Sequence, residues 1–544
     1  MGILVAVRPS FFHKFGTASV AIPCSLSLLL LVQTILRLPN FFEPYWYGDE
    51  GIYLTIGTAL NRGARLYTDI VDHKTPLIYI FAQVGSQLAF RVLLFFWLMA
   101  ATMLFFFLAK KLLKKNWAVI LASSVFMVFT TLPWFEGNIP NGELFVIGFV
   151  LAGLWLISQT PFFENAVLIQ TSQAKLWSIG NSLRLFFGGS LLGLAILTKI
   201  PAIFDLAAVV SLAYFSILNT VINWPIKLTA WWQSLRVTVL QGVIIGLGVA
   251  LPILLSILYF VAQGSGSDYL QFGLLYNFQY SGSWQLDVTN PMLVFFFTLP
   301  GKIAFLVATF GLLTIFAKLL PNQAKFTIGW FALAFIASLL SNRPYSHYFM
   351  QAIPPLAVLL AMTAENVWPI AKLPQKKLGQ VITLLFSGGL VSFFIATLFI
   401  MHVGLYPTWS YYRNFYAYST GKMPRAEYFE SFNYLMAENY HLAAIIKADA
   451  PDKIFIWGTN PMLYALSATR PVGRFTVAFH IEDLGVQAET IQKVREALPL
   501  YIVVMRDQNS SLPGLSALLS SKYLPFETTQ HMIVWKKLSK YRYN

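Results

Sequence analysis

Residues 45–81 read YWYGDEGIYLTIGTALNRGARLYTDIVDHKTPLIYIF and lie between two apolar segments that can each cross a bilayer as a helix. The stretch is rich in charged and titratable side chains, namely Asp49, Glu50, Asp72, His73 and Lys74. Such side chains are costly next to the hydrocarbon boundary unless they meet water, a partner or a substrate. The stretch therefore predicts a membrane fold with a candidate site in one of its loops.

The composition is that of a membrane protein. Of 544 residues, 57% are hydrophobic and 11% are charged, and the mean hydropathy is +0.63. Apolar runs near the ~20 residues that a spanning helix needs recur along the chain, without the alternation of barrel strands. A single cysteine, Cys24, excludes a disulfide within the chain and any metal site built from several cysteines.

Apolar runs with basic flanks predict a mainly α transmembrane bundle of about 11 spans, within a range of roughly 10 to 13. The spans are expected near 17–37, 89–109, 117–134, 143–159, 184–199, 201–220, 237–262, 292–317, 326–341, 347–364 and 380–403. This transmembrane domain would occupy residues 1–404, with a first outward loop at 41–88 and a second at 135–142. Helices at 49–62 and 76–88 are expected along the outer interface, because they are apolar on one side only.

The formal charge of +15 is explained by basic residues in alternate loops, and no nucleic-acid partner is expected. These residues are Lys110, Lys111, Lys114, Lys115, Lys175, Arg184, Lys227, Arg236, Lys372, Lys376 and Lys377. The loops at 135–142 and 263–291 contain no Lys or Arg. Because basic loops stay in the cytoplasm, we predict a multi-pass protein of the plasma (inner) membrane with a cytoplasmic N-terminus and an extracytoplasmic C-terminal part.

Residues 405–544 are more polar and predict a small extracytoplasmic α/β domain. Apolar runs at 453–458, 500–505 and 532–538 predict strands, and the periodicity of 491–498 predicts an amphipathic helix. We interpret this domain as a rigid lid or as a platform for an acceptor.

Three carboxylates are candidate catalytic groups: Asp49 and Glu50 in the first outward loop, and Glu143 after the second. A carboxylate at a helix start is held in one orientation and kept ionised, as a general base requires. The alternative is that each one only caps a helix or favours the positive end of its dipole. Because two acidic loops face the same side of the membrane, we expect Asp49 to be the base and Glu143 to assist, while Glu50 fits either role.

The candidate ligands for a phosphate group are Lys74, Lys199, Arg343 and His347. A cation that faces acidic loops can neutralise a phosphate leaving group, although a Lys at a membrane interface also serves as an anchor. An outward Arg343 departs from the charge rule, which favours a role in binding an anion. His73 is a candidate metal ligand or an inert interface residue.

The ordered set resembles the polytopic C-type glycosyltransferases, and among them the bacterial relatives of protein O-mannosyltransferases and of the lipid A aminoarabinose transferase. The resemblance covers most of residues 17–404. It rests on the acidic pair, on HKTP at 73–76, on Glu143 and on RPYSHYFMQAIPPLA at 343–357. It implies a membrane enzyme with Asp49 and Glu143 as its two loop carboxylates and Lys74 as the cation that holds a lipid phosphate.

The expected function is inverting transfer of a sugar from a polyprenyl-phosphate donor to an acceptor hydroxyl at the outer face of the membrane. The expected partners are this donor, membrane lipids and an acceptor that is a glycan, a lipid or a protein. A divalent metal is left open, because His73 stands where the aminoarabinose enzymes have a glutamate. One alternative is a transporter or flippase of lipid-linked sugars, with charges deep in the spans such as Asp205. The other is a non-catalytic protein of envelope assembly, in which the acidic loop residues could be neutralised without loss of function.

Overall fold

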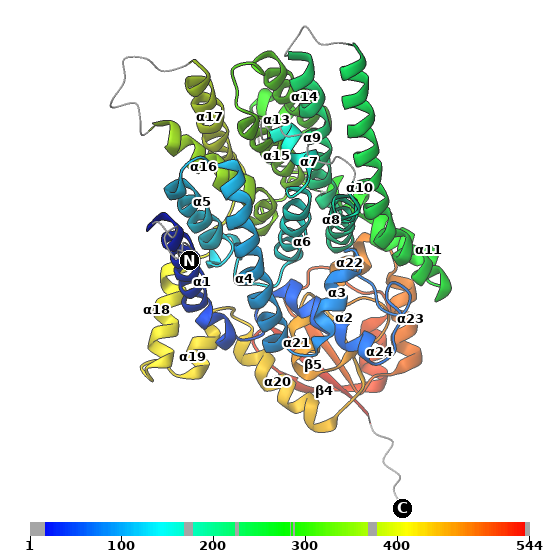
Figure 1. Ribbon diagram of the computed structural model, residues 1–544. Helices are drawn as coiled ribbons and strands as arrows, with labels where there is room; N and C mark the ends of the chain where they lie inside the picture. The colour runs from blue at the N-terminus through cyan, green and yellow to red at the C-terminus, as the bar shows by residue number, and fades with distance from the viewer. Residues whose placement is uncertain are drawn as a thin grey trace, which may run out of the picture.

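The computed structural model of the chain describes residues 17–167, 178–222, 228–282, 284, 286, 289–367 and 378–538. Figure 1 shows a helical bundle with a smaller, sheet-containing part at its lower end. Several basic residues behind the predicted orientation lie outside the described residues: Lys175, Lys227, Lys372, Lys376 and Lys377.

The apolar runs form helices, because a chain in lipid must satisfy its backbone hydrogen bonds within each segment. The bundle contains α1 (Thr17–Arg37), α4 (Gln87–Leu112), α5 (Asn116–Phe129), α6 (Gly142–Ile157), α7 (Pro161–Val167), α8 (Ile179–Thr198), α9 (Ile203–Ile222), α10 (Leu228–Ala262), α13 (Pro291–Phe297), α14 (Leu299–Ile315), α15 (Asn322–Ser338), α16 (Ile353–Val367) and α17 (Leu378–Ile400). Among the described residues, seven helices are long and apolar enough to cross a membrane, or up to nine if each bent pair is one span. The chain is therefore a multi-pass membrane protein with the predicted, mainly helical fold, while the number of about 11 spans stays a prediction.

The bundle contains two bent helix pairs. The helices α6 and α7 meet at 91°, and α13 and α14 meet at 86°. Pro161 begins α7 and Pro300 lies in the first turn of α14, where proline lacks the N–H that would continue the preceding helix. The predicted span 292–317 merged α13 and α14, because an apolar run reports hydrophobicity but not the direction of the helix axis, whereas the predicted span 143–159 covers α6 and ends before α7.

The bundle exposes large apolar side chains along its helices. Leu247 and Leu258 on α10, Val307 on α14, and Leu385 and Phe399 on α17 are all exposed. A contiguous apolar surface of this kind is unstable in water and is suited to lipid. The helix surfaces therefore agree with a bundle immersed in a bilayer.

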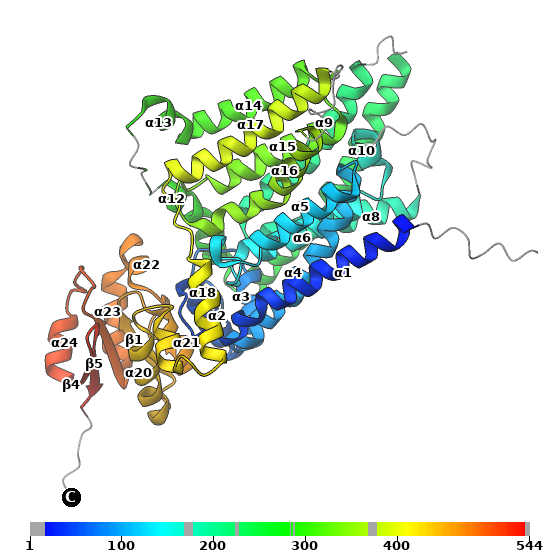
Figure 2. The same ribbon diagram turned by 90° about the vertical axis from the view of Figure 1, so that its left-hand side faces the viewer.

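The first outward loop folds into a short helix, α2 (Gly48–Asn61), which lies between the bundle and the sheet-containing part (Figures 1 and 2). A Cβ on Gly51 would lie 2.9 Å from the Met462 backbone nitrogen, and one on Gly57 would lie 2.5 Å from the Ala82 carbonyl oxygen. Both positions require glycine for this close approach. The predicted helices at 49–62 and 76–88 correspond to α2 and to the short helices α3 (Leu77–Phe81) and η2 (Ala82–Val84), and α2 is covered by protein instead of lying free on the interface.

The C-terminal part is an α/β unit with a five-stranded sheet in the order β2-β1-β3-β5-β4. Strand β1 pairs in parallel with β2 and β3, whereas β5 pairs antiparallel with β3 and β4. Its elements are α18 (Thr408–Ser419), α19 (Arg425–Glu430), α20 (Met436–Asp449), β1 (Lys453–Trp457), α21 (Pro461–Ser467), β2 (Arg470–Pro471), α22 (Ala478–Asp483), α23 (Gln487–Ala497), β3 (Tyr501–Met505), α24 (Leu515–Lys522), β4 (Tyr523–Thr528) and β5 (Met532–Lys537). The three predicted strands and the predicted helix are present, and the predicted boundary after residue 404 falls between α17 and α18.

A buried charge cluster fixes the first loop to α4. The Arg91 guanidinium donates to Glu50 Oε1 at 2.8 Å and Oε2 at 2.7 Å, and it lies 2.9 Å from Glu43 Oε2. It also donates to the Asn40 carbonyl oxygen at 2.8 Å. Arg91 and both carboxylates are almost fully buried. One cation therefore neutralises two acidic side chains that water does not reach.

We expect the Arg91→Met protein to lose about 3–5 kcal/mol of folding stability, because two carboxylates would stay buried without their cation. Thermal unfolding monitored by size exclusion in detergent measures this loss. Arg184→Met, which removes an exposed arginine from α8, is the matched control and should change stability little. An Arg91→Met protein as stable as this control would show that the cluster contributes nothing to folding.

Candidate active site

The candidate residues of both outward loops lie at the end of the bundle that carries the sheet. Helix α4 begins at this end with Gln87, and its 26 residues span about 39 Å. The basic residues at its other end, Lys110, Lys111, Lys114 and Lys115, therefore lie about a membrane thickness away.

Asp49 and Lys74 form an ion pair at the centre of the candidate site. The Lys74 ammonium lies 3.2 Å from Asp49 Oδ2, and the same oxygen accepts a hydrogen bond from the Tyr53 hydroxyl at 3.2 Å. Tyr47, and not Asp49, is the N-cap residue of α2, so the side chain of Asp49 is free of a capping role. The Asp49 side chain is 30% exposed and that of Lys74 is 12% exposed. The carboxylate is thus held by a cation and is still open to solvent.

Next to this pair lies a triad of possible metal ligands, Asp72, His73 and His480, the last from α22 in the C-terminal part. His73 Nδ1 is 3.0 Å from Asp72 Oδ1 and 3.3 Å from His480 Nε2, and His480 Nε2 is 3.5 Å from the same Asp72 oxygen. Ligand atoms about 2.0–2.2 Å from a tetrahedral ion are roughly 3.3–3.6 Å apart.

Two further observations fit a shared cation in this triad. Asp72 Oδ1 is buried and has no hydrogen bond of good geometry to a described residue. Burial lowers the pKa of His480 to about 3, so its imidazole is neutral and can offer a lone pair. The donor set of one carboxylate and two imidazoles is one that Zn²⁺ accepts.

A chain of aromatic contacts leads from the triad to Lys199. The His73 ring stacks on Tyr280 with centroids 4.5 Å apart, and the Arg343 guanidinium lies 4.1 Å from the Tyr280 ring. The hydroxyls of Tyr280 and Tyr348 are 3.4 Å apart. The Lys199 ammonium lies 4.1 Å from the Tyr348 ring. Arg343 and Lys199 are therefore linked to the first loop through two tyrosines.

Side chains of the second loop close this chain of contacts. Lys199 forms an ion pair with Glu143, whose oxygen lies 4.0 Å from His347 Nε2. His347 Nδ1 lies 2.8 Å from Glu136, which also accepts a hydrogen bond from the Tyr47 hydroxyl. Tyr47 precedes Asp49 by two residues. We call this closed set of contacts the polar ring, with the members Tyr47, Asp49, Asp72, His73, Lys74, Glu136, Glu143, Lys199, Tyr280, Arg343, His347, Tyr348 and His480.

Charge pairing keeps Asp49 and Glu136 of the polar ring ionised. Burial alone would raise the pKa of Asp49, but Lys74 and His347 outweigh it and hold this pKa below its usual value. Burial also opposes ionisation of Glu136. The charge of His347, and hydrogen bonds donated by His347, Tyr47 and Ser346, nevertheless keep the pKa of Glu136 below its usual value. The pKa of Lys74 is lowered by burial but raised more strongly by Asp49 and Asp72. At neutral pH the site therefore contains ionised acids beside a protonated lysine.

Two charged residues considered from the sequence lie outside the polar ring. Glu50 is held by Arg91 in the buried cluster that fixes the first loop. Glu143, by contrast, belongs to the polar ring, and Asn141 instead of Glu143 is the N-cap residue of α6. Asp205 accepts hydrogen bonds from Trp330 at 2.8 Å and Gln351 at 2.6 Å. We assign Glu50 and Asp205 to packing, because each is buried and paired within the helices.

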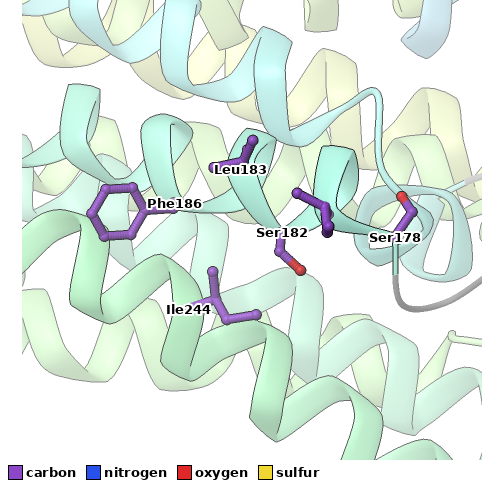
Figure 3. Close-up of a pocket in the computed structure, with 6 residues that line it drawn as sticks. Ser178, Ser182, Leu183, Phe186 and Ile244 are labelled. Atoms are coloured by element: carbon purple, nitrogen blue, oxygen red, sulfur yellow. The ribbon is translucent and has the colours of Figure 1, made fainter.

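The polar ring is also separate from an apolar cavity of about 430 Å³ between α8 and α10 (Figure 3). This cavity is lined mainly by Leu183, Phe186, Ile179 and Ile244 near the first residues of α8. Lys199 follows the other end of α8, about 30 Å away along 20 residues of helix. The cavity is therefore remote from the charged residues.

Sequence reasoning did not assign a role to several members of the polar ring, including His480, Tyr280 and Tyr47. His480 follows a predicted strand by more than twenty residues and carries no local motif. Tyr280 lies in a loop in which the absence of Lys and Arg was the only signal used. The His and Tyr side chains of the loop at 263–291 and of the C-terminal part include Tyr280 and His480, and residue type alone could have made them candidates.

No protein-family model and no curated protein matches the sequence. The crystal structure of ArnT from Cupriavidus metallidurans bound to undecaprenyl phosphate is 14% identical, with a TM-score of 0.51, and the match covers 94% of this chain and 98% of that chain. This chain has the fold of ArnT. The same ArnT in the apo state gives 12% identity and a TM-score of 0.51, with 95% and 98% covered.

The archaeal oligosaccharyltransferase AglB from Archaeoglobus fulgidus, in complex with an inhibitory peptide and a dolichol-phosphate, is 12% identical. That match has a TM-score of 0.45 and covers 91% of this chain and 70% of AglB. The predicted fold resemblance is confirmed by ArnT. An identity of 14% establishes the fold alone, so the activity and the substrates must be argued from the site.

Proposed function

We propose that this protein is an inverting glycosyltransferase that moves a sugar from a polyprenyl-phosphate donor to an acceptor hydroxyl. The observation that supports this most directly is the partly exposed Asp49 carboxylate next to Lys74, within a ring of further acids and cations. The fold supports it as well, because ArnT with this fold binds undecaprenyl phosphate. The active site would lie on the extracytoplasmic side of the inner membrane, opposite the basic loops.

In the proposed reaction, Asp49 accepts the proton of the acceptor hydroxyl as its oxygen attacks the anomeric carbon. The bond from that carbon to the phosphate oxygen breaks, and its electrons leave with the polyprenyl phosphate. Lys74 neutralises the charge that grows on the phosphate, with Lys199 and Arg343 close enough to assist. Attack from the face opposite the phosphate inverts the anomeric centre.

The pairing of Asp49 with Lys74 suits this sequence of events. In the free enzyme, Lys74 holds the carboxylate in place and keeps it ionised. When a donor phosphate engages Lys74, Asp49 shares its cation and becomes a stronger base at the moment when a base is needed. Glu143 and Glu136 keep Lys199 and His347 oriented toward the same site.

Asp72, His73 and His480 would hold a divalent cation, most simply Zn²⁺, beside Lys74. A bound cation of this kind supplies additional positive charge next to the leaving phosphate. His480 would also tie the C-terminal part to the first outward loop.

The function is tested with the purified protein in lipid nanodiscs and a set of undecaprenyl-phosphate sugars. We expect undecaprenyl phosphate to be released and the transferred sugar to have the opposite anomeric configuration, which NMR of the product determines. Retention of configuration would contradict the mechanism. Movement of intact donor across sealed vesicles without its consumption would contradict the enzyme assignment and favour a flippase.

We expect the wild-type protein to retain about one equivalent of Zn²⁺ after dialysis, and the His480→Ala protein to bind it at least about tenfold more weakly, because one of three ligands is lost. Elemental analysis and zinc titration measure this without any activity assay. His441→Ala removes an exposed histidine from the same part of the chain and is the matched control. Equal zinc content in the wild-type and His480→Ala proteins would show that the triad does not bind the ion.

A further inference from the structure

A second cavity lies beside the polar ring and has no role in the chemistry described so far. Its volume is about 280 Å³, near the lower end for sites that bind small molecules. Its walls come from the first loop, the second loop and the start of the C-terminal part. The residues that line it include Trp46, Asn138, Tyr406, Ser410, Asn414 and Phe432.

The walls of this cavity are aromatic. The Trp46 ring lies 5.7 Å from Tyr406 and 5.7 Å from Phe432, at interplanar angles of 68° and 45°. These rings therefore form faces at different orientations around one space. Flat aromatic faces pack against the apolar C–H face of a sugar ring, which is itself rigid and of similar width.

Polar groups accompany these aromatic walls. The amide of Asn414 and the hydroxyl of Ser410 come from α18, and Asn138 comes from the second loop. Among the described residues, the Asn414 side chain has no hydrogen-bond partner. A few amide and hydroxyl groups among aromatic rings fix the orientation of a ligand that carries hydroxyls.

The cavity is directly connected to the candidate catalytic residues. Trp46 precedes Tyr47, which donates to Glu136 and lies 3.4 Å from His347. The carboxylates of Glu136 and Asp49 add to burial in raising the pKa of Tyr406, so its hydroxyl lies within electrostatic reach of both. The cavity therefore borders the polar ring through Trp46 and its neighbour Tyr47.

We propose that this cavity binds a sugar ring of the acceptor, so that the acceptor is a glycan. The inference rests on the proposed transfer reaction and names its acceptor class. A polyprenyl tail has no hydroxyl or amide groups to pair with Asn138, Ser410 and Asn414 of this lining. A cavity closed by three aromatic walls accepts a single ring more readily than an extended peptide.

The test is saturation-transfer NMR of the full-length protein with a panel of maltotriose, mannotriose, galactotriose and chitotriose, without any donor. We expect at least one of these to bind the wild type and its signal to fall at least fivefold in Ser410→Trp, which fills the cavity. Asn414→Leu keeps the shape of the cavity and should weaken the same signal. Ser419→Trp introduces the same side chain at an exposed position of the same helix and should behave as the wild type.

Binding by none of the four saccharides, or equal binding by the wild-type and Ser410→Trp proteins, would overturn the proposal. A Ser410→Trp protein that has lost its size-exclusion profile is replaced by Asn414→Leu for this decision. Saccharide binding without any turnover of a polyprenyl-phosphate sugar would refute the proposed function and leave the cavity assignment intact. Consumption of the donor without saccharide binding would refute the cavity assignment and leave the proposed function intact.

Discussion

We expect the Asp49→Asn protein to transfer sugar about 10²- to 10⁴-fold more slowly than the wild type, because the amide has nearly the same shape but accepts no proton. Its affinity for the donor should be unchanged or slightly higher, since Lys74 no longer pairs with a carboxylate. Single-turnover assays with a labelled undecaprenyl-phosphate sugar measure the rate, and donor titration measures the affinity.

Two other carboxylates serve as controls for Asp49. Asp69→Asn neutralises an exposed acid in the same loop, whose ion-pair partner among the described residues is Arg65, and it should leave turnover unchanged. Glu50→Gln alters the buried partner of Arg91, so it should lower folding stability. The folded fraction of this variant should transfer sugar at the wild-type rate. Asp49→Asn turnover equal to that of Asp69→Asn would remove Asp49 from the role of base.

The different roles of Asp49 and Glu50 illustrate what the sequence could not decide. Both were predicted at the start of a helix, and α2 does begin at Gly48. Successive residues on an α-helix point about 100° apart, so one faces Lys74 and the other faces Arg91. Only the positions of these two cations distinguish the residues, and they depend on how α2 packs against α4 and α21.

The helices and the central strands were predictable because hydrophobicity alone specifies them. Long apolar runs can fold only as helices in lipid, and β1, β3 and β5 are short apolar runs within a polar segment. The edge strands were missed for a physical reason. β2 has two residues, and β4 contains Pro525 beside a register shift, both of which blur the pattern of a strand.

Contacts between distant segments were the least predictable part of the candidate site. His480 reaches His73 across a sequence separation of 407 residues, and nothing in the surrounding AFHIED suggests a ligand. The cations had local signals, because Lys199 and Arg343 stand out in outward loops that otherwise contain few basic residues. Their connection through Tyr280 and Tyr348 required the packing of three separate segments.

We expect Lys74→Gln to lower kcat/KM for the lipid-linked donor by about 10²- to 10³-fold, because the ammonium is the cation nearest to Asp49 and would meet the leaving phosphate. The loss should appear in both KM and kcat, since the phosphate carries charge in the donor and gains more as the bond breaks. Steady-state kinetics with a varied donor concentration separate the two. Lys493→Gln breaks a Lys–Glu pair of 2.7 Å on the surface of α23 and should change neither parameter.

A double-variant cycle then tests whether Lys74 and Asp49 act as one unit. The protein carrying both Asp49→Asn and Lys74→Gln should be only slightly slower than the slower single variant, because the base and the phosphate cation serve the same transition state. Fully multiplicative losses would mean that the two groups act independently. A Lys74→Gln protein with normal donor kinetics would place the phosphate on Lys199 and Arg343 instead, because these are the other cations of the polar ring.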